Sequence, residues 1–149
     1  MSRLLFATSD ELTLTIARLI LGVVFFMHGA QKALGWFGGY GYAGTMQFFT
    51  HTMHIPPAFA FLAIMAEFLG GIGLIIGFLS RIAAIAIAVN MLVAIFKIHC
   101  HFGFFMNWSG TQKGEGYEFH LLALALCLVI FVKGAGALSI DRAISGGRR

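Results

Sequence analysis

The run R-L-I-L-G-V-V-F-F-M-H-G-A-Q-K, residues 18–32, decides the fold. It is apolar enough for a bilayer, yet it begins with Arg18 and carries His28 and Lys32 near its end. With the apolar residues that precede it, the run reaches about 20 residues, enough for a helix to cross about 30 Å of hydrocarbon. A charge inside such a span costs about 2.5–3.5 kcal/mol on insertion scales. The sequence therefore predicts a small membrane bundle in which other polar groups offset this cost.

The composition agrees with a membrane protein. Of 149 residues, 59% are hydrophobic and only 11% are charged, whereas a soluble domain carries about 25% charged residues. The net charge of +4 comes from basic residues that are scattered and flank apolar runs, as membrane topology requires. These features exclude a disordered chain, argue against a soluble enzyme, and give no sign of a nucleic-acid partner.

Four apolar runs predict an all-α, integral membrane four-helix bundle that forms a single domain over residues 1–149. The predicted spans are residues 12–32, 58–79, 82–98 and 117–137. Residues 45–54 mix large apolar and polar side chains, which predicts a short interfacial segment between the first two spans. The aromatic-rich loop at residues 99–116 is expected to be partly buried or re-entrant.

Four spans place both termini on one side of the membrane. That side collects six basic residues and the other side three, which favours cytoplasmic termini and a bacterial or archaeal inner membrane. With this topology, all six histidines lie near the outer face.

Helical phase at about 100° per residue brings polar and small side chains onto common stripes. The first span carries Arg18, Gly22, Phe25, Gly29 and Lys32 on one stripe. In the second span, the predicted bundle-facing stripe contains Glu67, Gly70 and Gly71. In the third span it contains Asn90, Ala94 and Lys97. In the fourth span it contains Glu118, Leu122, Ala125 and Val129. Such mixed stripes are typical of the side of a membrane helix that faces its neighbours.

Glu67 is the only acid within another apolar span, and we predict that it pairs with Arg18. Glu67 and Asn90 lie about mid-span, and Arg18 is expected about one helical turn further in. Two interpretations stay open for the pair. It is either a structural ion pair that fixes helix register or the floor of a ligand site.

The histidines also raise the question of a metal. His99 and His101 flank Cys100, and His51 and His54 are one turn apart. Neither pair has a standard metal-site spacing. No metal site is predicted, and His99 and His101 are the residues that come nearest to one.

Four separated motifs, in this order, resemble the DoxX family. They are R-L-I-L-G-V-V-F-F-M-H-G-A-Q-K (18–32), E-F-L-G-G-I-G-L-I-I-G-F-L-S-R (67–81), H-F-G-F-F (101–105) with G-Y-E-F-H-L-L (116–122), and G-A-G-A-L-S-I-D (134–141). The family takes its name from a subunit of an archaeal thiosulfate:quinone oxidoreductase. The resemblance implies a four-helix inner-membrane protein associated with quinone or thiol redox chemistry, and it assigns no catalytic residues.

Two functional hypotheses follow. In the first, the protein is a redox subunit that binds a quinone at the outer end of the bundle. His28 or His101 then exchanges protons with the headgroup, Lys32 or Lys97 stabilises anionic charge, and Glu118 is a further candidate. Arg18, Glu67 and Asn90, which lie deeper in the membrane, are candidates for binding the quinone at the inner end of the site. Electrons come from a partner protein or a diffusible donor, because the sequence carries no cofactor motif of its own.

In the second hypothesis, the chain is a non-enzymatic accessory, scaffold or assembly subunit of a larger membrane complex. In either case we expect the lipid bilayer, other membrane subunits or further copies of the chain as partners. Substitution of His28 or Lys32 separates the two, because only a redox subunit loses activity while the protein still accumulates.

Overall fold

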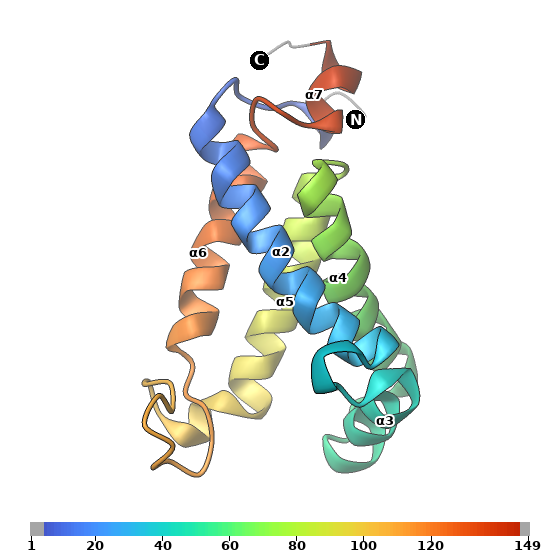
Figure 1. The fold of residues 1–149 in the computed structure, drawn as a ribbon, viewed down its shortest axis with the longest axis vertical. Coiled ribbons are helices and arrows are strands. Elements are labelled where there is room, and N and C mark those ends of the chain that lie inside the picture. Colours follow the sequence, from blue (N-terminus) through green and yellow to red (C-terminus); the bar gives the residue numbers. More distant parts are fainter. Residues whose placement is uncertain (1–4, 147–149) are drawn as a thin grey trace.

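The structure, a computed structural model, describes residues 5–146, and every regular element in that range is a helix or a helical turn. Four long helices make up most of it (Figure 1). They are α2 (Leu12–Leu34), α4 (Pro57–Ile76), α5 (Ser80–Lys97) and α6 (Glu118–Lys133). The shorter elements are α3 (Gly41–Gln47), α7 (Ile140–Ser145), a π-helical turn (Phe48–Thr52) and two 3-10 turns (Trp36–Gly38 and His99–Phe102).

The prediction of an all-helical fold with apolar spans is confirmed. Helices α2, α4 and α5 are long and apolar enough to cross a membrane. Helix α6 has 16 residues, so the fourth span remains a prediction. It is shorter than the predicted 117–137 because Gly134 takes a φ of 89° and ends the helix. A Cβ atom at Gly134 would lie 2.5 Å from the Ala7 carbonyl oxygen, so the chain turns there against the N-terminal segment.

The long helices pack in chain order. The most extensive contact is between α2 and α4. Helix α4 also packs on α5, α5 packs on α6, and α6 contacts α2. Helix α7 and the segment that precedes α2 lie at one end of the molecule, and α3 lies at the other (Figure 1). We refer to these as the α7 end and the α3 end.

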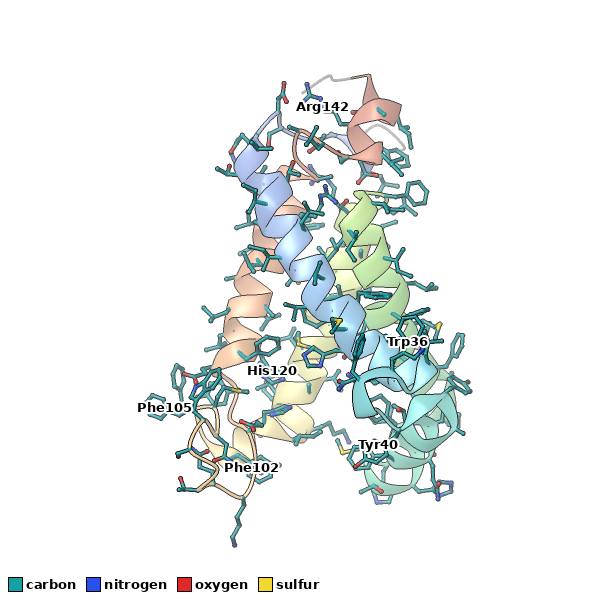
Figure 2. The ribbon with its side chains drawn as sticks, viewed as in Figure 1. Trp36, Tyr40, Phe102, Phe105, His120 and Arg142 are labelled. Atoms are coloured by element: carbon teal, nitrogen blue, oxygen red, sulfur yellow. The ribbon has the colours of Figure 1, made fainter. Side chains whose placement is uncertain are left out.

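The segment between α2 and α4 is more helical than predicted. Helix α3 begins at Gly41, before the predicted interfacial segment 45–54, and the π-helical turn follows directly. Large aromatic side chains are exposed around this end, with Tyr40 88% and Trp108 87% exposed. Figure 2 shows Trp36, Tyr40, Phe102 and Phe105 at the end opposite Arg142. Phe105 and Trp108 are exposed, so the rest of the protein does not cover the loop after α5 at these residues. The re-entrant position of this loop in a membrane stays a prediction.

Glycines let the backbones of α2 and α4 touch, as the sequence predicted. A Cβ atom on Gly29 would lie 2.4 Å from the backbone nitrogen of Phe68, and one on Gly71 would lie 2.4 Å from that of Phe26. Gly22 lies against Ile75 in the same way, one heptad from Gly29. Close backbone contact at small residues is a main source of association between membrane helices.

The contact at Gly29 gives a direct prediction. Gly29→Ala should lower the free energy of unfolding in detergent by about 1–3 kcal/mol, because the added methyl group meets backbone that cannot move aside. Gly70→Ala is the matched control, since its Cβ would lie 3.4 Å from the flexible end of Ile87. Equal losses in the two variants would contradict this account of the α2–α4 interface.

Candidate functional site

Arg18 is 1% exposed and binds backbone carbonyl oxygens instead of an acid. Its Nε donates to Ala135 O (2.8 Å), Nη1 to Ile75 O (2.8 Å) and Leu74 O, and Nη2 to Leu138 O (2.6 Å). Two of these carbonyls belong to the last turn of α4, where a helix has no acceptor partners of its own. The predicted pairing of Arg18 with Glu67 is therefore wrong.

The register of the α2–α4 interface explains the error. Gly29 faces Glu67 and Phe68, and Gly22 faces Leu74 and Ile75. Continued along α2, this register sets Arg18 beside Gly77, where a Cβ atom would lie 3.0 Å from the Arg18 Cζ. Gly77, which follows the last residue of α4, is ten positions from Glu67. This is about 15 Å along the helix and beyond the reach of an arginine side chain.

Glu67 pairs with Lys32 instead. The Lys32 Nζ donates to Glu67 Oε2, and the Asn90 Nδ2 donates to Glu67 Oε1 over 2.8 Å. The Glu67 side chain is only 5% exposed, and that of Lys32 is 26% exposed. These residues, the Lys32–Glu67–Asn90 cluster, come from α2, α4 and α5, and so join three helices at one level.

The cluster lies on the wall of a pocket of about 1250 Å³ toward the α3 end. His28, Lys97, His99 and His120 also line it. Along α4 and α5 the pocket continues as an apolar groove, lined by residues that include Leu62, Ala66, Leu69, Ile82, Ala86 and Val89. The pocket therefore combines charged, hydrogen-bonding side chains at one end with a long apolar groove.

A second polar group on the pocket wall consists of His99 and His120. Their ring centroids are 4.0 Å apart. His120 is 6% exposed, and its Nδ1 has no hydrogen-bond partner among the described residues. The His99 Nδ1 lies 2.8 Å from the Glu115 carbonyl oxygen. His28, which is exposed toward the pocket, has its ring 6.1 Å from that of Phe119.

The structure separates two predicted candidates from the pocket. His101 is exposed and is not among the residues that line it. Glu118 holds the preceding loop, because its Oε1 accepts hydrogen bonds from the Met106 backbone N–H (2.8 Å) and from Trp108 Nε1 (3.1 Å). Within residues 5–146 no group of three or more His, Cys, Asp or Glu side chains could hold a metal ion.

The predicted inner stripe of the fourth span is wrong. Leu122 is 69% exposed and Val129 is 41% exposed. The buried residues of α6 are His120, Ala123, Cys127 and Ile130. The prediction took Glu118 as the marker of the inner face, but this carboxylate faces the loop. A phase chosen from the small residue Ala123 and from Cys127 would have found His120.

A family model described as DoxX matches residues 13–100, from the beginning of α2 to the turn after α5. The chain belongs to the DoxX family. A relative named "Inner membrane protein YqjF" of Escherichia coli (strain K12) is 30% identical over 91% of this chain and 95% of its own. A protein named "Putative oxidoreductase CatD" of Bacillus subtilis (strain 168) is 26% identical over 95% of this chain and 93% of its own. No solved structure matches the chain.

The DoxX match covers most of the site. Residues 13–100 include Arg18 and the whole Lys32–Glu67–Asn90 cluster, as well as His28, Lys97 and His99. His120 and Glu118 lie beyond the matched range. The predicted family is confirmed, and the chain is a DoxX membrane protein.

Proposed function

We propose that this protein binds the headgroup of a membrane-soluble quinone in the pocket at the α3 end, as part of a redox complex in a bacterial inner membrane. The observation that carries the proposal is the partly buried Lys32–Glu67–Asn90 cluster, with its Glu67 side chain only 5% exposed, on the wall of a pocket that is otherwise largely apolar. A buried ion pair is costly unless it has a structural or functional use. The name of the Bacillus subtilis relative supports a redox role.

The proposal includes a topology. We place α2, α4, α5 and α6 across the membrane as a four-helix bundle, with the α7 end in the cytoplasm and the α3 end outside. Arg81 and Arg142 lie at the α7 end, where they bind the N-terminal segment through Ala7 O and Asp10. Basic residues on that side are what the positive-inside rule favours.

The polar groups of the pocket suit a quinone headgroup. The Lys32 ammonium, held by Glu67, can donate to a ring oxygen and stabilise negative charge that develops on it. Reduction of a quinone by two electrons also takes up two protons, and His28 on the pocket wall can exchange them. In this proposal the electrons come from a partner protein or a diffusible donor.

The apolar groove between α4 and α5 suits the isoprenoid tail. Residues at a spacing of three or four positions from each helix line it, so the groove follows the helices along the membrane. A ligand that enters sideways from the lipid could place its headgroup at the cluster and keep its tail in the groove. Small ligand sites in proteins combine an apolar wall with a few convergent polar groups in this way.

The test is equilibrium binding of a decyl-tailed benzoquinone to the purified protein in lipid nanodiscs, corrected for empty nanodiscs. We expect saturable binding that the double variant Lys32→Met/Glu67→Met weakens at least tenfold. Ala86→Phe, which fills the groove, should weaken binding of the decyl-tailed quinone but not that of the same quinone without a tail. His51→Ala is the control, since His51 is exposed and does not line the pocket.

Absence of saturable binding to the wild-type protein would overturn the proposal. It would leave the accessory or scaffold hypothesis as the better account of the chain. Equal weakening by His51→Ala and by the double variant would also contradict a site at the cluster.

A further inference from the structure

His120 is a buried imidazole whose hydrogen-bonding capacity is not met within the described residues. It is 6% exposed, and its Nδ1 has no partner. Burial of a polar group without a hydrogen bond costs about 1–3 kcal/mol in proteins. His120 lines the pocket. Its Nδ1 is covered by protein, but Nε2 is neither hydrogen-bonded nor among the covered atoms of the described residues, so Nε2 is the nitrogen that a molecule in the pocket can reach.

His99 holds the His120 ring in place. The two rings are in contact, with centroids 4.0 Å apart and planes tilted by 42°. His99 is itself oriented by the Glu115 carbonyl oxygen, 2.8 Å from its Nδ1. This contact requires a proton on His99 Nδ1, which leaves its Nε2 as the acceptor. The pair is therefore an ordered polar group and not a mobile surface feature.

The histidine pair and the Lys32–Glu67–Asn90 cluster line the same pocket. Helices α2 and α5 each pack against both α4 and α6, so α4, with Glu67, and α6, with His120, stand on opposite sides. Aromatic rings surround His28 on the same pocket wall. Phe119 has its ring centroid 6.1 Å from that of His28 and 6.4 Å from that of Phe25. Figure 2 shows His120 on the inner side of α6, toward α2 and α5.

We infer that His120, positioned by His99, is a second hydrogen-bonding point for the bound headgroup, opposite Lys32. The ligand class is then a flat ring with polar oxygens at two opposite positions, one bound at Lys32 and the other at His120. A 1,4-quinone has this pattern, and a ring with a single oxygen does not. The inference rests on the proposed function and specifies how the same pocket recognises its ligand.

The experiment compares two probes on the same protein in nanodiscs. The first is a decyl-tailed 1,4-benzoquinone, and the second is an alkylphenol with the same decyl tail and one ring oxygen. His120→Phe keeps the ring volume and removes both nitrogens. It should weaken binding of the quinone about tenfold and that of the alkylphenol less than twofold. The ratio of the two affinities does not depend on how much of a variant is folded.

Two further variants complete the test. His120→Gln keeps a hydrogen-bonding side chain and should restore part of the preference for the quinone, which a purely structural role would not produce. His101→Phe changes an exposed histidine outside the pocket and should leave both affinities unchanged.

The inference is overturned if His120→Phe weakens both probes equally, or neither. If the wild-type protein binds the quinone, Lys32→Met/Glu67→Met loses it, and His120→Phe keeps the ratio of the two probes, the inference fails and the proposed function stands. If the wild-type protein binds neither probe, both fail together.

Discussion

Arg18→Leu is expected to prevent the protein from accumulating in the membrane. The Arg18 guanidinium supplies donors to the carbonyls of Leu74, Ile75, Ala135 and Leu138. Leucine supplies none, so four acceptors lose their partner in a site where the arginine is 1% exposed. At about 1–3 kcal/mol for each buried group that stays unsatisfied, a loss of at least about 3 kcal/mol is expected.

The structural position of Arg18 explains why the loss should be this large. Two of its acceptors are at the end of α4, where the negative end of the helix dipole also favours a cation. The other two are in the segment that joins α6 to α7. Arg18 thus fastens the C-terminal segment to the α2–α4 pair. Asp141 makes a similar connection, because its carboxylate accepts from the backbone N–H groups of Leu79 (2.8 Å) and Ser80 (2.9 Å).

The measurement is the amount of folded protein in membranes and its unfolding temperature in detergent. Arg18→Lys keeps the charge but replaces a planar fork with a single ammonium group, and should recover only part of the loss. Arg142→Leu is the control, since Arg142 binds Asp10 at an exposed site, and exposed ion pairs contribute about 0–1 kcal/mol. Glu67→Gln should not rescue Arg18→Leu. Rescue would mean that the two side chains are coupled after all.

Arg18 illustrates which features of the fold can be predicted from the sequence and which cannot. The stripe through Gly22, Phe25 and Gly29 follows from periodicity, and the structure buries it. The polar character of the interior also follows from the few charges within apolar runs. The offset between two helices does not follow, because it is set by which glycine meets which backbone atom. An error of about ten residues in that offset led us to predict Arg18, in place of Lys32, as the partner of Glu67.

The histidine side of the site was less predictable. His28 was placed by its position at the end of an apolar run, and it lines the pocket. His120 was not predicted as a site residue, because the charged Glu118, two residues earlier, suggested a different inner face for α6. His101 seemed equivalent to His99 in the sequence, yet the 3-10 turn at His99–Phe102 leaves His101 exposed. Loop geometry of this kind is not encoded in a periodic pattern.

Lys32→Met is expected to destabilise the protein by about 3 kcal/mol, because it leaves the Glu67 carboxylate buried without its cation. Glu67→Met should cost less. The Lys32 side chain is 26% exposed, and a long lysine side chain can extend its ammonium toward the aqueous end of the helix. The double variant Lys32→Met/Glu67→Met removes both charges, and its free energy of unfolding should lie within about 1 kcal/mol of that of the wild-type protein. Asn90 keeps a second acceptor in that variant, the Ala63 carbonyl oxygen at 3.3 Å.

The free energies of unfolding of the four proteins in detergent form a double-mutant cycle, which isolates the Lys32–Glu67 coupling from other effects of each change. A coupling of at least about 2 kcal/mol is expected, and strictly additive losses would show that the pair contributes nothing to stability. Because the double variant is expected to be both stable and unable to bind the quinone, it separates the two uses of the cluster. If it were stable and still bound the quinone with wild-type affinity, the ion pair would serve only to hold α2 against α4.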